Sequence, residues 1–390
     1  MECRVFVAAC PDYAQAEEKT AELIERMGGM GRFARPGETL LLKANLLAAA
    51  GPERAVSTHP AVVGAAAKLV AGQGARAVIG DSPGGPYLES GLRHLYEKTG
   101  MRAAAEASGA ALNYDVSTRQ VSLPEGKVLH SAQVIAPAVE SDGILNLCKL
   151  KTHLFMSMTG AVKNHFGLIP GVTKVGFHAS HQDKGQFADM LLDLALWAAP
   201  RLNLMDAVLA MEGEGPGASG TPRPVGLLLA SENPLALDIV AGEIIGLPRL
   251  GNPVLLAAQR RGLPSRIEEV ELVGAGIDAL RIPDYRFPAH VRTNIMEFLG
   301  PLTGPAARLA KSWMAQTPQI RPERCVGCGI CKNACPAGAI TLEAHRARID
   351  SRNCIHCYCC HELCPQKAVA LKQGALSRLF QSQSVHRRRH

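Results

Sequence analysis

Two cysteine runs with the same spacing constrain this chain more than any other feature. Each run has four cysteines separated by two, two and three residues, and a proline follows the last one. The runs are Cys325, Cys328, Cys331 and Cys335, then Cys354, Cys357, Cys360 and Cys364. Gaps of two residues let one loop wrap three corners of a [4Fe-4S] cubane. A zinc ribbon would instead place two cysteine pairs far apart. The repeat predicts a bacterial-type ferredoxin module with two [4Fe-4S] clusters.

The spacing also predicts how the cysteines are shared between the clusters. In modules of this type the fourth cysteine of a run ligates the other cluster. The expected ligands are Cys325, Cys328, Cys331 and Cys364 for cluster 1, and Cys354, Cys357, Cys360 and Cys335 for cluster 2. Using Cys359 in place of Cys360 would break the spacing, so we expect Cys359 to be a packed thiol. His356 and His361 either tune the second cluster or, more simply, are surface histidines.

The N-terminal sequence and the charge balance indicate the location and the expected partners of the protein. The N-terminal sequence MECRVFVAAC lacks the parts of a signal peptide, and no apolar run is long enough to cross a bilayer. With clustered cysteines, this predicts a cytoplasmic protein without a membrane segment. Residues 321–390 hold 12 Lys+Arg against 4 Asp+Glu, a balance of +8. Eight thiolates and two oxidised cluster cores would bring this to about +4, so nucleic acid is not an expected partner.

Residues 1–290 alternate apolar β-rich runs with Ala-rich helical patterns. The expected strands are Arg4–Ala9, Thr39–Leu42, Arg76–Ile79, Val134–Ala136, Gly143–Leu147, Asn203–Met205, Gly226–Ala230 and Val270–Val273. The expected helices are Ala14–Met27, Pro60–Gln73, Leu88–Gly100, Gln186–Ala199 and Pro234–Ile245. This alternation predicts an α/β fold with a mostly parallel, helix-covered sheet. We expect a linker at 291–318 with a short amphipathic helix at Ala306–Met314, a small α+β ferredoxin-like domain at 319–372 and a basic disordered tail at 373–390.

Charged and amide side chains follow four of the expected strands. They are Lys43 and Asn45, then Asp81, then Lys149, Lys151 and His153, and lastly Asp206. Ligands in open α/β sheets bind beyond the carboxyl ends of the strands. Lys149, Lys151 and His153 also alternate, so an extended chain would put them on one face. Together they predict a ligand crevice, although each feature alone could be a solvated edge residue or a turn.

Further along, a helix start predicts an anion site. Thr159 is expected to cap a helix that carries Lys163 and Asn164, and lysines beside a helix start favour negative charge. Glu212 opens a Gly-rich loop through Gly217. His178 and His181 are placed on a loop over residues 176–184. A second metal on His153, His165, His178 and His181 would match no standard ligand spacing.

These motifs, in this order, resemble the DUF362 family over roughly residues 1–285. The matching runs are Lys43-Ala-Asn45, Thr58-His59-Pro60, Gly80-Asp81-Ser82-Pro83-Gly84, Lys149-Leu-Lys151-Thr152-His153, Thr159-Gly160-Ala-Val-Lys163-Asn164 and Glu212-Gly213-x-Gly215-Pro216. The resemblance implies an iron–sulfur protein, often fused to a ferredoxin-like domain, and no particular reaction. Cys148 departs from the family pattern, which usually has proline there. It is either a nucleophile or thiol ligand, or a small buried side chain.

We therefore expect low-potential electrons to pass from the clusters to a small anionic substrate or cofactor in the crevice, as in a ferredoxin-dependent reductase. The expected anion-binding residues are Lys43, Asn45, Lys149, Lys163, Asn164 and Glu212. The expected catalytic residues are His153 as proton donor, Lys151, Asp81 and Asp206. The alternatives are a non-catalytic electron carrier that docks a partner redox enzyme, and a redox sensor. A flavin or second metal, the partner protein and the reaction itself stay open.

Overall fold

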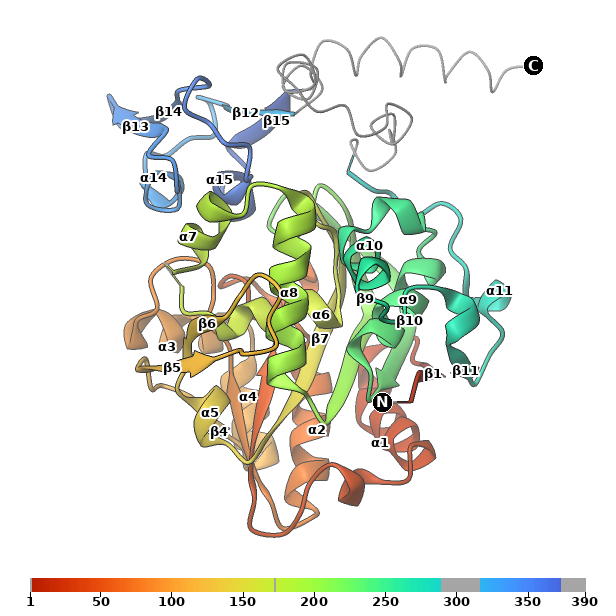
Figure 1. The fold of residues 1–390 in the computed structure, drawn as a ribbon. Coiled ribbons are helices and arrows are strands. Elements are labelled where there is room, and N and C mark those ends of the chain that lie inside the picture. The colour runs from red at the N-terminus through yellow and green to blue at the C-terminus, as the bar shows by residue number, and fades with distance from the viewer. Residues whose placement is uncertain (1, 172, 289–315, 373–390) are drawn as a thin grey trace, which may run out of the picture.

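The computed structural model describes residues 2–171, 173–288 and 316–372. A central sheet carries helices on both faces, and a small β-containing module lies over one end of it (Figure 1). The expected linker helix at Ala306–Met314 and the tail at 373–390 lie outside the described residues. No helix in the described part of the chain is long and apolar enough to cross a bilayer.

The sheet has the strand order β11-β1-β10-β9-β7-β2-β3-β4, with β8 added to β7. Its strands are β1 (Arg4–Ala9), β2 (Thr39–Ala44), β3 (Arg76–Gly80), β4 (Ala111–Leu112), β7 (Gly143–His153), β8 (Ser157–Thr159), β9 (Leu202–Gly213), β10 (Gly220–Ser231) and β11 (Glu271–Val273). Strand β10 is antiparallel to both neighbours and β8 is antiparallel to β7. The other described pairings are parallel, so the predicted mostly parallel sheet is confirmed.

The strand order reverses between β2 and β7. The chain runs from β2 outward to β3 and β4 on one side, and from β7 outward to β9 and β10 on the other. Since β2, β3, β7 and β9 are parallel, their carboxyl ends share one edge of the sheet. A reversal of this kind leaves a crevice beyond the strand ends.

Helices cover both faces, which explains why the strands are continuously apolar. Leu40 and Leu42 of β2 pack with one set of helices, whereas Leu41 packs with the other. The first set is α1 (Ala16–Arg26), α2 (Pro60–Ala71), α3 (Glu89–Lys98) and α4 (Met101–Ser108). The second is α6 (Ala161–Asn164), α8 (Lys184–Ala198), α9 (Pro234–Ile244) and α10 (Pro253–Arg260).

Three expectations need correction. The predicted strand Val134–Ala136 lies largely in β6 (Ser131–Ile135), which pairs with β5 (Thr118–Ser122) in a separate hairpin. Helices α4 and α10 were not predicted, because short Ala-rich and Pro-started segments gave weak periodic patterns. The loop expected over residues 176–184 begins inside α7 (Thr173–Ser180), so His178 is helical.

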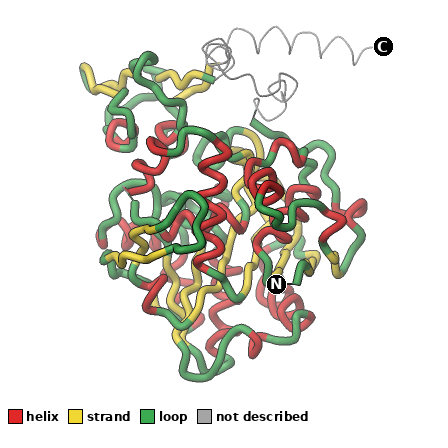
Figure 2. The backbone as a smooth tube through the Cα atoms, in the orientation of Figure 1, coloured by secondary structure: helices red, strands yellow, loops and turns green. Residues whose placement is uncertain are grey.

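The small module has two two-stranded sheets. Strand β12 (Thr317–Ile320) pairs with β15 (Val369–Lys372), and β13 (Ile340–Glu343) pairs with β14 (Arg346–Ile349). The helices α14 (Ile330–Asn333) and α15 (Cys359–Glu362) occupy equivalent places in the two cysteine runs. Figure 2 shows this module of short strands and helices set against the large domain.

Candidate functional site

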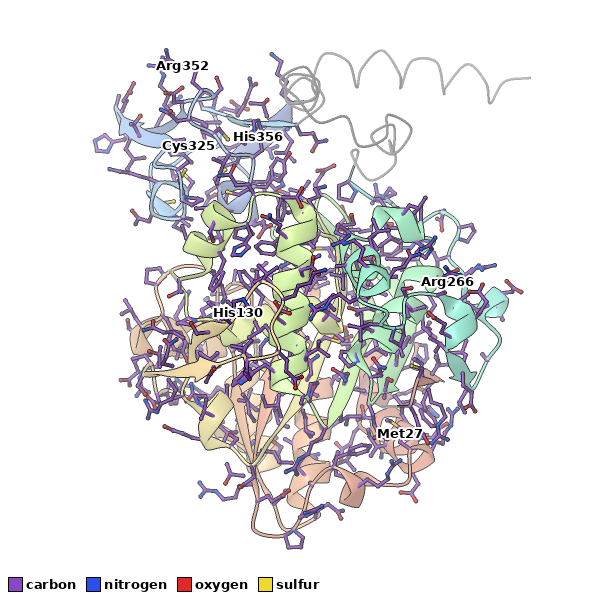
Figure 3. All side chains as sticks on the ribbon, in the orientation of Figure 1. Met27, His130, Arg266, Cys325, Arg352 and His356 are labelled. Carbon is purple, nitrogen blue, oxygen red and sulfur yellow. The ribbon has the colours of Figure 1, made fainter. Side chains whose placement is uncertain are left out.

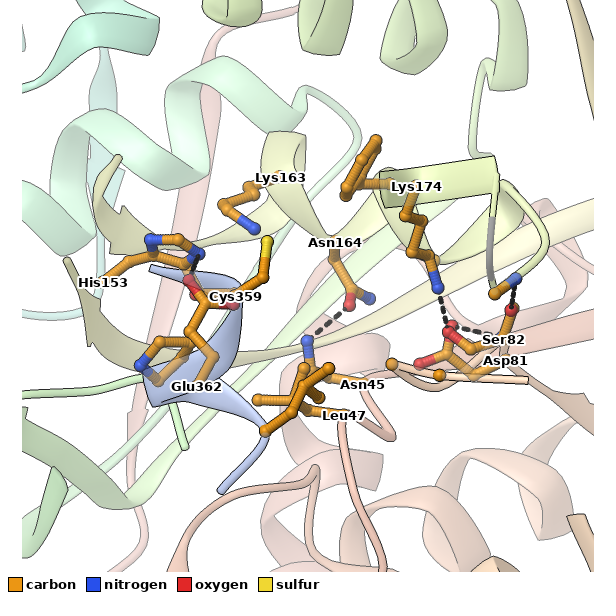
Figure 4. A pocket seen from close by; sticks show the side chains of 18 of the residues that line it. Asn45, Leu47, Asp81, Ser82, His153, Lys163, Asn164, Lys174, Cys359 and Glu362 are labelled. Atoms are coloured by element: carbon orange, nitrogen blue, oxygen red, sulfur yellow. Dashed lines mark hydrogen bonds and ion pairs between the residues drawn. The ribbon is translucent and has the colours of Figure 1, made fainter. Parts of the chain in front are cut away.

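A cavity of about 100 Å³ lies at the carboxyl ends of β2, β3 and β7. That volume holds several waters or a small ligand. Seven of the ten crevice residues expected from the sequence line it: Lys43, Asn45, Asp81, Lys151, His153, Lys163 and Asn164. Figure 4 shows five of these side chains gathered around the cavity from strand ends, loops and α6: Asn45, Asp81, His153, Lys163 and Asn164. The predicted convergence of strand-end residues is therefore found at the point where the strand order reverses.

One wall of the cavity comes from the ferredoxin module. Cys359, Glu362 and Leu363 line it together with the large-domain lysines, and Figure 4 shows Cys359 and Glu362 facing His153 and Lys163. Two glycines of the large domain permit this contact. A Cβ at Gly84 would overlap the side chain of Leu363, and one at Gly217 would overlap the carbonyl oxygen of Glu362. The sequence analysis did not predict this wall, although the Gly-rich loops indicated places where another segment could approach the backbone closely.

His361 also joins the module to the large domain, and is buried. Its Nδ1 lies 2.8 Å from the Val369 carbonyl oxygen and its Nε2 lies 3.4 Å from the Glu214 carbonyl oxygen. The favoured expectation of a surface histidine is wrong for this residue, because α15 is the docking face of the module.

Buried amides tie two of the crevice lysines into the scaffold. The Nζ atom of Lys43 lies 2.9 Å from Oδ1 of Asp81 and donates to the Oδ1 atom of Asn164 at 3.2 Å. Lys151 donates to the Oδ1 atom of Asn45 at 2.7 Å and to the Val56 carbonyl at 2.6 Å. The Nδ2 atom of Asn45 then donates to Asn164 at 2.8 Å. Burial first, and then the nearby Lys163 and Lys149, hold the pKa of Lys151 well below its usual range.

Lys163 is the cation best placed to take a ligand. Within the described parts of the chain it has no hydrogen bond or ion pair, and its ammonium lies 5.6 Å from the centre of the Phe166 ring. Burial lowers its pKa, while Glu362 and then Cys359 raise it. Because the Lys163 ammonium is partly desolvated and has no bonded partner among the described residues, it favours an anionic oxygen in the cavity.

His153 is held as one tautomer. Its Nδ1 atom accepts hydrogen bonds from the Phe155 and Met156 amides at 3.0 and 3.2 Å, so a neutral ring carries its proton on Nε2. Nε2 lies 3.3 Å from Glu362 Oε1, and neither atom has an aligned hydrogen bond within the described residues. Burial first, and then Lys163, keep the pKa of His153 well below its usual range. The ring is suited to donate a hydrogen bond and is a poor acid.

Lys174 on α7 was not predicted as a site residue. Its ammonium donates to the Pro83 carbonyl at 3.2 Å and to the Ser82 carbonyl, in the Gly-Asp-Ser-Pro loop. Burial lowers the pKa of Lys174 to about 7. Lys174 lies inside α7 and not at a strand end, so the strand-end pattern does not predict it.

The other histidines do not form a metal site in the described ranges. His178 stacks on Phe187 with ring centres 4.7 Å apart, and burial lowers its pKa to about 3. The Nδ1 atom of His165 lies 3.2 Å from the Val162 carbonyl oxygen, and His181 lies beside Ser180. Over residues 2–171, 173–288 and 316–372, no three His, Cys, Asp or Glu side chains converge on a single ion position.

Lys149, Asp206 and Glu212 lie outside the crevice. Lys149 lies opposite Asp206 in the β7–β9 ladder, and its ammonium pairs with the Asp206 carboxylate at 2.6 Å and donates to the Tyr13 hydroxyl at 3.0 Å. Glu212 is bound by the amide and guanidinium of Arg286. These three residues, expected to bind or act on a ligand, instead have partners that hold the fold together.

Removing the Asp206 charge should destabilise the protein. Asp206→Asn would leave the ammonium of Lys149, which is fully buried, without its carboxylate, and breaking such a pair costs about 3 kcal/mol. The melting temperature should fall by several degrees. The matched control is Asp350→Asn, whose partner Arg352 is exposed, with an expected cost below about 1 kcal/mol. Equal melting temperatures for the two variants would contradict this assignment.

The expected anion site at the helix start is filled by the protein itself. The Ala161 and Val162 amides donate to the carboxylate of Asp238 at 2.5 and 3.0 Å. Gly160, and not Thr159, is the N-cap, and a Cβ at Gly160 would overlap Asp238. Cys148 is likewise buried in the core, where its Sγ lies 3.6 Å from the Leu204 carbonyl oxygen. Of its two alternatives, the small buried side chain fits the structure.

The ferredoxin cysteines surround two further small cavities. Cys325, Cys328, Cys331 and Cys364 line the first, and Cys335, Cys354, Cys357 and Cys360 line the second. The Ala339 and Ala368 amides donate to the sulfurs of Cys335 and Cys364, each at 3.2 Å, as suits anionic thiolates. Cys359 lines the crevice and neither of these cavities. Both groups are the crossed sets expected from the spacing, so the residues present fit two clusters.

Comparison with known proteins also divides the chain into a large domain and a ferredoxin module. Residues 40–243 match the family model of a domain of unknown function, DUF362, and residues 315–368 match that of a 4Fe-4S dicluster domain. A thylakoid-associated protein of Synechocystis sp. (strain PCC 6803) is 34% identical over 275 residues, which cover 68% of this chain and 83% of that protein. No solved structure matches. The dicluster match supports a role in iron–sulfur electron transfer.

Proposed function

Because the chain belongs to the DUF362 family and joins that domain to a 4Fe-4S dicluster domain, we propose that it reduces a small anionic substrate or cofactor in the crevice. The clusters would supply the electrons, one from each. The large domain would bind the anion and the ferredoxin module would close over it.

The observation that carries this proposal is the position of α15. Cys360 on this helix lines the second cysteine cavity, whereas its neighbour Cys359 and nearby Glu362 line the crevice. One short helix therefore borders both the expected cluster and the expected substrate. This supports direct electron transfer between them without a second carrier.

The charges of the cavity support an anionic ligand. Lys151, Lys163 and Lys174 line it, and Asp81, one of its carboxylates, is already paired with Lys43. Burial lowers the pKa of all three lysines, and a bound anion would raise these values again. His153 would orient the ligand through Nε2–H.

Two-electron reduction of an oxo acid or an unsaturated acid also takes up two protons. Lys174, which lines the cavity and whose pKa burial lowers to about 7, would donate one of them. The second would come from solvent after the module opens. His153 was expected to donate a proton. Because burial keeps its pKa well below the usual range, the ring would be neutral and would donate a hydrogen bond instead.

The test is anion-dependent reoxidation of the reduced clusters. The protein would be reduced without oxygen and mixed with a panel of oxo acids, unsaturated acids and phosphate esters, with cluster absorbance as the readout. Lys163→Met should slow the reaction with the active compound ten- to a hundredfold, as about 1.5–3 kcal/mol of charge-assisted bonding is lost. Affinity should also fall as pH rises through about 7, since Lys174 then loses its charge.

Lys98→Met, at the exposed end of α3, is the matched control and should react like the native protein. If Lys163→Met and Lys151→Met both reoxidise at the native rate with every compound, the crevice is not the site of reduction. A carrier without catalysis would show no anion-dependent reoxidation at all. The cytoplasmic location stays a prediction, and the presence of a flavin or second metal in the crevice stays open.

A further inference from the structure

The two cysteine groups differ in their access to solvent. Cys328, in the first group, is exposed, whereas Cys360, in the second, is buried in the core of the module itself. Figure 3 shows the module at the edge of the large domain, with Cys325 of the first cysteine run and His356 of the second labelled in it. Cys328 therefore gives the first group a ligand that another protein can reach.

An apolar patch surrounds Cys328. Val326, Ile330 and Leu342 are 63%, 40% and 38% exposed, and all three border the same cavity as Cys328. A Cβ at Gly329 would lie 3.6 Å from Leu342, so the cysteine loop rests on the β13–β14 hairpin and the patch is continuous. These are three of the eight large exposed apolar side chains in the described residues. Such a concentration marks an interaction site.

Basic side chains border the patch. Arg324 and Lys332 lie two residues outside its ends in the cysteine loop, and Arg346 faces Glu343 across the hairpin. None of these three bases has an ion pair in the part of the chain that the structure describes. The neighbouring acids are Glu323, which is exposed, and Glu343, which pairs with Arg348 at 3.2 Å. Four bases against two acids leave the border positive.

We propose that the patch formed by Val326, Ile330 and Leu342 is the docking surface for an acidic one-electron carrier protein. The carrier would lose one electron and the cluster held by Cys325, Cys328, Cys331 and Cys364 would gain it. The apolar centre would exclude water at the exposed ligand, and the basic border would attract and orient the carrier. The rest of this chain is a poor occupant, since the tail at 373–390 is itself basic. This surface does not depend on the crevice having a substrate.

The test measures how fast a reduced acidic flavodoxin reduces the clusters of the full-length protein. Lys332→Glu combined with Arg346→Glu should lower the second-order rate constant at least about tenfold at low ionic strength. The native rate should fall as salt is added. Photoreduced deazaflavin, a small neutral reductant, should reduce both proteins equally fast. Arg352→Glu combined with Arg102→Glu makes the same charge change away from the patch and should react within about twofold of native.

Equal slowing in the two double variants, or a rate that salt leaves unchanged, would overturn the proposal. A photo-crosslinker in place of Val326 gives a second readout that does not depend on rates. Crosslinking to the flavodoxin is the expected result. Crosslinking only to residues 289–315 or 373–390 of this chain would show that the chain covers its own patch, and would overturn the proposal too. In all of these tests the crevice residues stay native, so failure here is distinguishable from failure of the proposed reduction.

Discussion

Cys360→Ser should remove one cluster, whereas Cys359→Ser should leave both. The two residues are adjacent, but Cys360 lines the second cysteine cavity and Cys359 lines the crevice. Loss of one thiolate ligand destabilises a cubane that has four protein ligands. Iron content should fall from about eight to about four atoms per chain in Cys360→Ser, and the magnetic coupling between the two reduced clusters should disappear.

The measurements are iron and sulfide content and electron paramagnetic resonance of the reduced protein. Cys359→Ser is a matched control, because it makes the same chemical change one position away. The reverse result, a cluster lost in Cys359→Ser and kept in Cys360→Ser, would refute the ligand assignment.

Gly217→Val should separate the ferredoxin module from the crevice. Even a Cβ at Gly217 would overlap the carbonyl oxygen of Glu362, so valine must push α15 outward. Overpacking of this kind costs about 2 kcal/mol, which changes the ratio of docked to undocked molecules about thirtyfold. Anion-dependent reoxidation should fall at least about tenfold, while iron content stays native.

Hydrogen exchange provides a direct readout of docking. Backbone amides of α15 and of the Gly-rich loop should exchange faster in Gly217→Val than in the native protein. Gly176→Ala is the control, since Gly176 lies on α7 beside the crevice and a Cβ there meets nothing within 4 Å. Unchanged exchange and unchanged reoxidation in Gly217→Val would show that the contact does not hold the module in place.

The sequence predicted those features that depend on neighbouring residues. The spacing of the cysteines predicted both groups that line cavities, and the apolar runs predicted the strands whose ends bear Lys43, Asp81 and Lys151. Parallel strands bring the residues at their carboxyl ends together regardless of the conformation of the connecting loops.

Features that depend on distant residues were missed. The wall formed by Glu362 depends on docking across more than 200 residues of chain from His153. Lys149 pairs with Asp206, opposite it in the β7–β9 ladder, whereas Lys151 bonds to Asn45. No alternation pattern along β7 reveals this difference. Asp238 fills the start of α6 from a helix some 75 residues later. Each of these contacts is decided by tertiary packing, because the local sequence does not distinguish between the possible partners.

The position of α15 has a consequence for how the protein is handled in air. Small metal-ligated modules owe much of their folding energy to the bound metal, and α15 carries a cysteine expected to ligate one of the clusters. Oxygen that destroys this cluster would therefore also loosen the wall of the crevice. A preparation that has lost its brown colour would lack the binding site as well as the electrons. Any screen for a ligand should accordingly be run without oxygen, on protein whose iron content has been measured.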